Sequence, residues 1–245
     1  MVGVKNILDR TLFSLKNNLH STERVAELCA QYHKKVLFTS SSEVYGKSQK
    51  KSFSEDDDLI LGSSSQRRWS YASVKITEEH LFLAYAKEAD LPVVITRLFN
   101  TVGERQSAAY GMVLPSFVQR ALAGQRLEVY GDGTQQRCFC YVKDVVESLA
   151  KLMSAEQANG EVINIGSEEL VTINQLAQEV IAQTNSASTI QYIPYEQLQR
   201  SGYADMIYRR PNIEKAKHLI SFSPRLRWKD VVTKVIDAQR KELEL

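Results

Sequence analysis

The segment from Pro92 to Phe99 constrains the fold most, because it is an almost continuous run of apolar residues. Runs of this kind are typical of strands that are buried on both faces of a parallel sheet. A second apolar run, Val36–Thr39, precedes it, and the stretch from Trp69 to Glu88 between the two lacks Gly and Pro and predicts a helix. Strand, helix and strand in this order make a βαβ unit, so the sequence predicts an α/β fold with a parallel sheet.

Shorter elements are predicted on both sides of this unit. Apolar residues at helical spacing from Leu15 to Tyr32 predict an amphipathic helix. A capping-box pattern at Thr172 to Gln175 predicts the start of another. Other predicted helices span residues 113–123, 142–153, 212–219 and 228–243, and predicted strands span residues 127–130, 138–141, 162–165 and 189–193.

Composition is that of an ordinary globular protein and excludes some classes of function. The 245 residues are 43% hydrophobic and 24% charged, and 31 Lys and Arg against 29 Asp and Glu leave a net charge of only +2. This balance shows no excess of basic residues of the kind that binds nucleic acid or an anionic membrane surface. Neither a secretion signal nor a segment of about 20 apolar residues is visible, so we expect a cytoplasmic location.

The cysteines and acidic residues do not predict a metal centre. Cys29, Cys138 and Cys140 have no zinc-type spacing, and a sparse, odd count fits a reducing compartment and packing roles. An acidic run, Glu55 to Asp58, lies in a polar loop that we expect to be solvated surface. We therefore predict no metal site.

Tyr71 and Lys75 are the strongest candidates for chemistry. Four residues apart on a helix, their side chains project from one face. A tyrosine has a reference pKa of about 10, and a lysine ammonium close by would lower that pKa and favour the phenolate. The phenolate could then take a proton from a substrate hydroxyl that a serine from Ser40 to Ser42 also contacts. A Tyr–Lys pair at this spacing also occurs as a plain surface pair, and the serine-rich strand end favours the site.

Three motifs extend this reading to a family. S-S-E-V-Y-G at residues 41–46, R-W-S-Y-A-S-V-K at residues 68–75 and R-L-F-N-T-V-G at residues 97–103 resemble the extended short-chain dehydrogenase/reductase family. Within it the chain is most similar to NAD-dependent nucleotide-sugar epimerases and decarboxylases, over nearly its whole length. The resemblance implies a partial Rossmann-type parallel sheet with a smaller mixed α/β lobe that binds substrate.

The resemblance also implies roles for individual residues. Tyr71 would be the base, Lys75 its activator and a ligand of the nicotinamide ribose, and Ser41, five residues before Gly46, the hydroxyl partner. Glu43 is a further catalytic candidate, since serine followed by Ser42-Glu43 resembles the decarboxylases, although related epimerase-like sequences share S-E-V-Y-G. The cofactor NAD would be bound by Asn18, Ser40, Tyr71 and Lys75.

A second set of residues would bind a UDP-sugar. Asn100 would bond the diphosphate, and Arg137 in G-D-G-T-Q-Q-R and Arg209 in D-M-I-Y-R-R-P would contact phosphate, for which guanidinium is well shaped. Exposed ion pairs are the alternative for both arginines. The backbone of residues 128–130 would lie where the family binds the uracil base. The complete substrate set is Asn100, Val113, Leu114, Glu128, Tyr130, Arg137 and Arg209.

One part of the family pattern is missing from the sequence. Nucleotide cofactors on α/β sheets usually sit over a glycine-rich turn after the first strand, and the eleven glycines here form no such turn. Residues 1–4 resemble the turn after the family's fourth strand, and residues 18–22 resemble its N-x-x-G-T helix with Ser21 in place of glycine. We therefore expect the chain as written to bind NAD weakly. Residues 1–105 would be the C-terminal part of the NAD-binding domain, and residues 106–245 mainly the interleaved substrate lobe.

Several functions remain open at this point. The first expectation is a UDP-hexose 4-epimerase that works through a transient 4-keto sugar, although this chain would be inactive by itself. The alternatives are a UDP-glucuronate decarboxylase and an inactive nucleotide-sugar-binding remnant. A 4,6-dehydratase is disfavoured, because its pattern has aspartate where Ser42 stands. The resemblance further implies a homodimer, formed through the helices at residues 15–32 and 71–88, and no nucleic-acid or membrane partner.

Overall fold

A three-stranded parallel sheet lies at the centre of one half of the molecule. The computed structural model describes residues 9–107, 112–199 and 208–243. Its main sheet has the order β1–β2–β7, from β1 (Val36–Ser41), β2 (Val93–Leu98) and β7 (Val162–Ile165). β1 and β2 pair in parallel with Val36 opposite Val93, and β2 and β7 pair in parallel with Ile95 opposite Val162. The predicted α/β fold with a βαβ unit is confirmed.

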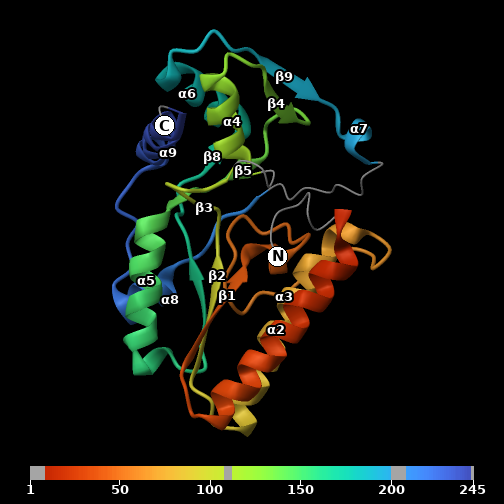
Figure 1. Ribbon diagram of the computed structural model, residues 1–245, viewed down its shortest axis with the longest axis vertical. Helices are drawn as coiled ribbons and strands as arrows, with labels where there is room; N and C mark the ends of the chain where they lie inside the picture. The colour runs from red at the N-terminus through yellow and green to blue at the C-terminus, as the bar shows by residue number, and fades with distance from the viewer. Residues whose placement is uncertain (1–8, 108–111, 200–207, 244–245) are drawn as a thin grey trace.

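Helices cover both faces of this sheet, as Figure 1 shows. On one side lie α2 (Thr11–Gln31) and α3 (Ser70–Glu88), where Phe82 packs with Val93 and Ile95. On the other side lie α5 (Val142–Ser154) and α8 (Glu214–Ile220), where Val94 packs with Ile163. Neighbouring residues of β2 thus enter two different cores, which is why that strand reads as a continuous apolar run.

The second half of the molecule is built from later parts of the chain. It contains α4 (Val113–Leu122), α6 (Ile173–Thr184), α7 (Tyr195–Gln199) and α9 (Trp228–Leu243), with β4 (Leu127–Tyr130) parallel to β9 (Ile190–Ile193). α6 begins at the predicted capping box, in which Thr172 and Gln175 bond each other's backbone. α4, α6 and α9 share one apolar core that includes Leu114, Leu176 and Val235.

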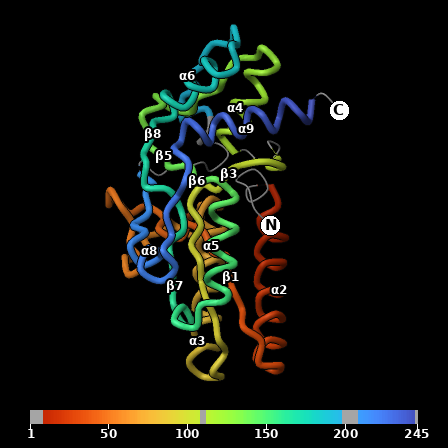
Figure 2. Tube along the Cα trace, turned by 90° about the vertical axis from the view of Figure 1, so that its left-hand side faces the viewer, coloured from red at the N-terminus to blue at the C-terminus, as the bar shows by residue number. Residues whose placement is uncertain are grey.

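The chain crosses between the two halves several times. Two short strand pairs, which the sequence did not predict as pairs, lie between them: β3 (Thr101–Val102) with β6 (Cys140–Tyr141), and β5 (Gln136–Arg137) with β8 (Val171–Thr172). α5, β7 and α8 return to the main sheet after α4 and β4 have left it (Figure 1). In the view of Figure 2, α2 runs along one side of the molecule. The division at residue 105 stays a prediction.

The polar loop that contains the acidic run is not all solvated surface, so that expectation was wrong around Phe53 and Glu55. Phe53 is fully buried, its N–H donates to the Arg210 carbonyl at 2.8 Å, and its carbonyl accepts from the Asn212 N–H at 2.8 Å. A Glu55 carboxylate oxygen accepts from the Asn164 N–H at 2.8 Å. The loop is therefore fixed to β7 and to the segment before α8. Within the described part of the chain there are also three short 3-10 turns, Ser42–Tyr45, Arg67–Trp69 and Glu156–Ala158.

Candidate active site

Three consecutive serines at the end of β1 have three different partners. Ser40 donates to the Glu79 carboxylate inside the protein. The Ser41 side chain acts on Tyr71, whose pKa it lowers, and its hydroxyl accepts from the Glu43 N–H at 3.3 Å. Ser42 accepts from Nε of Arg209 at 2.9 Å. Of the three, Ser41 is the one that the structure brings to Tyr71, as the sequence analysis expected.

Tyr71 is a buried phenol whose pKa is raised rather than lowered. Burial is the main cause, the carboxylates of Glu43 and Glu78 add to it, and together they raise the pKa of Tyr71 to about 12, against the opposing effect of Ser41 and Arg209. The expectation of a lowered pKa was therefore wrong for the protein without ligands. At neutral pH the Tyr71 side chain is a protonated phenol.

Lys75 lies one helical turn after Tyr71 on α3, but its charge has other partners. Its Nζ is 3.0 Å from a Glu78 carboxylate oxygen and donates to the Thr39 carbonyl at 3.2 Å. The ammonium also lies 4.3 Å from the centre of the Phe38 ring. An ion pair of this kind offsets the positive charge of Lys75, which was expected to lower the pKa of Tyr71.

Glu43 is held between two guanidinium groups. One carboxylate oxygen is 2.5 Å from Nη2 of Arg68 and the other is 2.7 Å from Nη2 of Arg209. Burial by itself would raise the pKa of Glu43, but Arg209 and Arg68, with a smaller effect of Arg137, lower it to about 2. Glu43 is therefore a carboxylate at any ordinary pH. Sequence reasoning missed Arg68, although it lies in the motif that carries Tyr71.

A buried polar network supports the strand ends under the site. Arg97 on β2 donates to both carboxylate oxygens of Glu79 at 2.8 to 3.2 Å and to the Tyr45 hydroxyl at 3.0 Å. Tyr45 in turn donates to the Asn164 side chain at 2.8 Å. Because Ser40 bonds the same Glu79, one network links β1, α3, β2 and β7, and this positions Ser41 next to Tyr71.

The two arginines that were predicted to bind the phosphates of the substrate lie near Glu43. Arg137 is buried and acts electrostatically on Glu43, which Arg209 contacts directly. The Asn100 amide donates to the Cys138 carbonyl at 2.8 Å, next to Arg137 in the chain. Residues 205–207 of the Arg209 motif lie outside the described residues. Neither arginine is the exposed ion pair that was the alternative, and their phosphate roles stay predictions.

The other predicted residues lie elsewhere. Leu114 is fully buried in the second core, and Val113 begins α4. Glu128 on β4 pairs with Arg120 at 3.0 Å, and the Tyr130 carbonyl accepts from Gln135 at 2.9 Å. Asn18 is half-buried on α2. These assignments also stay predictions.

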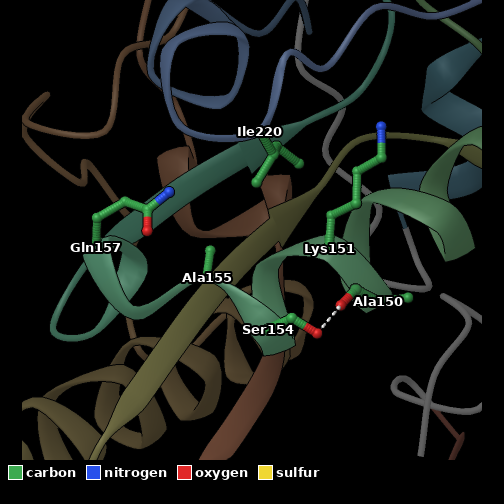
Figure 3. A pocket seen from close by; sticks show the side chains of 6 residues that line it. All are labelled: Ala150, Lys151, Ser154, Ala155, Gln157 and Ile220. Carbon is green, nitrogen blue, oxygen red and sulfur yellow. Dashed lines mark hydrogen bonds between the residues drawn. The ribbon is translucent and has the colours of Figure 1, made fainter.

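A surface hollow between α5 and α8 is separate from this site. It is lined by Ala150, Lys151, Ser154, Ala155, Gln157 and Ile220, and Figure 3 shows how these side chains lie. None of them is a predicted site residue. Among the residues that the structure describes, no group of three His, Cys, Asp or Glu could hold a metal ion, and no helix is long and apolar enough to cross a membrane.

The described residues fit one end of a nicotinamide cofactor. The Ser41, Tyr71 and Lys75 side chains offer hydroxyls and an ammonium to a ribose. The turn at Gly131 and Gly133 is no cradle for a pyrophosphate, because protein atoms fill it: a Cβ there would lie 2.3 Å from Tyr195 and 2.0 Å from Asn174. The described residues therefore supply contacts for the nicotinamide ribose and no glycine cradle for the phosphates.

A parallel α/β sheet with a serine at the end of one strand, a tyrosine on the next helix and a lysine one turn further defines a short-chain dehydrogenase/reductase type of protein. A model of the "NAD dependent epimerase/dehydratase family" matches residues 3–166. The chain belongs to this family, whose members use NAD as cofactor.

Similar proteins act on UDP-sugars. The chain is 40% identical over 237 residues to a UDP-N-acetyl-alpha-D-glucosaminuronate decarboxylase from Bacillus cytotoxicus, and 33% identical over 239 residues to UDP-glucuronic acid decarboxylase 1 from Danio rerio. These matches cover 96% and 98% of this chain but 73% and 55% of the relatives. The structure of UDP-glucuronic acid 4-epimerase from Bacillus cereus with UDP-glucuronic acid and NAD is similar with a TM-score of 0.78 at 26% identity, over 92% of this chain and 68% of that one.

Proposed function

We propose that the protein to which this chain corresponds oxidises a UDP-hexuronate at C4 and releases its C5 carboxylate as carbon dioxide. The observation that carries this proposal is the 40% identity, over 96% of the chain, to a UDP-N-acetyl-alpha-D-glucosaminuronate decarboxylase. A second decarboxylase relative supports it. This reverses the order of the two enzyme functions expected from the sequence alone.

Tyr71 would exchange the proton of the sugar C4 hydroxyl. NAD, when bound, accepts the C4 hydride and later returns it. Tyr71 must lose its proton to act as a base, and the pKa of about 12 would fall if a cation came close to the buried phenol. Ser41, which acts on the pKa of Tyr71, would hold the same sugar oxygen.

Decarboxylation follows from the product of that oxidation. A ketone at C4 is β to the C5 carboxylate, so the C5–carboxylate bond can break with its electron pair delocalised into the ketone as an enolate. A proton at C5 and a hydride at C4 then complete the new sugar. Arg209 and Arg137 would hold anionic groups of the substrate, since guanidinium binds phosphate and carboxylate with two parallel hydrogen bonds.

A 4-epimerase is the second candidate. It is supported by the similarity to the Bacillus cereus enzyme, which was crystallised with UDP-glucuronic acid and NAD. Such an enzyme would share the C4 oxidation and would return the hydride to the opposite face of the sugar without losing carbon dioxide.

The test is to incubate the protein with NAD and either UDP-N-acetylglucosaminuronate or UDP-glucuronate, and to analyse the nucleotide sugars by mass spectrometry and NMR. A product lighter by carbon dioxide supports the decarboxylase, and an isomer of unchanged mass supports the epimerase. UDP-glucose, which lacks the carboxylate, is the matched control. Calorimetry with NAD and with each nucleotide sugar distinguishes these enzymes from a non-catalytic binding protein. Such a protein would bind the nucleotide sugar but would form no product.

We also propose that two copies of the chain associate through α2 and α3. This is supported by large apolar side chains that are exposed among the described residues, namely Leu12, Phe13, Val25 and Leu28 on α2 and Tyr32 directly after it. Because an exposed apolar patch of this kind is typical of an interaction surface, a second copy would bury it.

A further inference from the structure

Glu78 is a buried carboxylate beside the candidate catalytic pair, and it has no role in the function proposed above. Its side chain is 1% exposed. One carboxylate oxygen lies 3.0 Å from Nζ of Lys75, and the other accepts a hydrogen bond of 2.6 Å from the Thr22 hydroxyl on α2. Thr22 is itself buried. Glu78 thus connects Lys75 to a second helix.

The three residues form one stripe along α3. Tyr71, Lys75 and Glu78 are separated by four and three residues, the spacing that puts side chains on the same face of a helix. A carboxylate next to the lysine is a poor neighbour for a group that should favour the tyrosine anion, since the two opposite charges offset each other at the phenol.

We propose that Glu78 is a positioning residue that holds Lys75 in an ion pair and offsets its charge at Tyr71 until a ligand draws the ammonium away. The proposal rests on the function proposed above, in which Tyr71 and Lys75 act together. The positive charge of Lys75 would then act fully on the Tyr71 phenol only when the ligand is bound. Ligand binding would therefore activate the site.

The other contacts of these residues are compatible with such an exchange. Lys75 also bonds the Thr39 carbonyl at 3.2 Å, at the end of β1, so it keeps an anchor near the site when it leaves Glu78. Glu78 keeps the Thr22 hydroxyl as a donor. A buried carboxylate that lost its only partner would be costly, and the bond to α2 reduces that cost.

Other charges also face Tyr71 and must be kept constant in a test. They are Glu43 in the turn after β1 and Arg209 from the segment before α8, and Glu43 is itself neutralised by Arg68 and Arg209. Burial and these carboxylates, Glu78 included, raise the pKa of Tyr71. Substitution of Glu78 alone changes one of these contributions and leaves the Glu43 cluster unchanged.

The experiment is a tyrosinate titration of the full chain by ultraviolet difference absorbance, in which the curve of Tyr71→Phe is subtracted to isolate Tyr71. Glu78→Gln should lower the pKa of Tyr71 by about one unit, because the charge of Lys75 is no longer offset. Lys75→Met should raise the pKa, and the double variant should titrate between the two single variants. Glu88→Gln, an exposed position on the same helix, is the matched control and should change nothing.

An unchanged Tyr71 titration in Glu78→Gln, with a native circular dichroism spectrum, would overturn the proposal. If Glu78→Gln does not fold, Glu78→Asp serves instead: it keeps the charge but shortens the side chain away from Lys75. Its Tyr71 titration should lie below that of the unaltered protein, and an equal one would also reject the proposal. Since the titration needs no turnover, its failure is distinct from a failure of the proposed catalytic function.

Discussion

The Arg209 guanidinium lies 2.7 Å from the Glu43 carboxylate, which joins the segment before α8 to the turn that follows β1. The same arginine donates to Ser42 at 2.9 Å. An anionic substrate group that binds Nη2 of Arg209 would therefore compete with Glu43, while Arg68 stays with the carboxylate at 2.5 Å. Arg209 is consequently the member of this cluster best suited to exchange partners.

Substitution of Tyr71 by Phe should abolish most of the turnover. The change removes only the hydroxyl that would exchange the sugar proton, and proton transfer of this kind contributes about 10²- to 10⁴-fold to a rate. The measurement is the initial rate of UDP-hexuronate conversion at saturating NAD. Tyr32→Phe, at the exposed residue that follows α2, is the control. A Tyr71→Phe protein that kept more than about a tenth of the rate would remove Tyr71 from the mechanism.

Substitution of Glu43 by Gln should destabilise the fold. It leaves the buried Arg68 and the largely buried Arg209 without their counter-charge, a change that typically costs about 3–5 kcal/mol of unfolding free energy. Urea unfolding followed by circular dichroism measures it. Glu27→Gln breaks the exposed pair with Arg24 at 3.0 Å and should cost less than about 1 kcal/mol. Equal effects of the two variants would contradict the assignment.

Glu43 should also make the stability depend on pH in the acid range. Its pKa is about 2 in the folded protein against an ordinary value of 4.5, so the folded state binds this proton less readily than the unfolded state does. The stabilisation is complete above pH 4.5 and is lost as the pH falls towards 2. Urea unfolding across this window should show a shallower decline in Glu43→Gln than in the unaltered protein. Parallel declines would mean that Glu43 has no depressed pKa.

Association through α2 should be sensitive to charge on its exposed apolar face. Light scattering at tens of micromolar should give the mass of a dimer, and Leu28→Glu should shift it towards the monomer, because a buried unpaired carboxylate is costly. Glu23→Gln, at an exposed polar position of the same helix, is the control. A monomer mass for the unaltered chain would reject the proposed interface.

Local sequence patterns predicted most of the fold. The double burial of β2 and the capping box of α6 each depend on a few adjacent residues, so both could be read directly from the sequence. The short pairs of β3 with β6 and of β5 with β8 could not, because each strand has two residues and is defined only by a distant partner.

The candidate site was predictable in its residue types but not in its electrostatics. The three motifs identified Ser41 and Tyr71, and in the structure the Ser41 side chain acts on the pKa of Tyr71. The pairing of Lys75 with Glu78 was not predictable, because it depends on burial under α2 and on Thr22. The pKa of Tyr71 followed the same rule, since burial dominates it. A signal was nevertheless present, as Glu78 stands one helical turn after Lys75.

The pairing of Phe53 with the backbone of Arg210 and Asn212 limits how this family member can diverge. This pairing fixes the position of the neighbouring Arg209. Without the pairing, the loop could accept insertions without moving Arg209. A residue added between Phe53 and Glu55 would displace either the buried phenylalanine or the arginine that meets Glu43, whereas one added among the exposed residues near Lys50 would disturb neither. Changes in loop length should therefore accumulate before Phe53, and a lineage that altered the loop after it would need a compensating change next to Arg209.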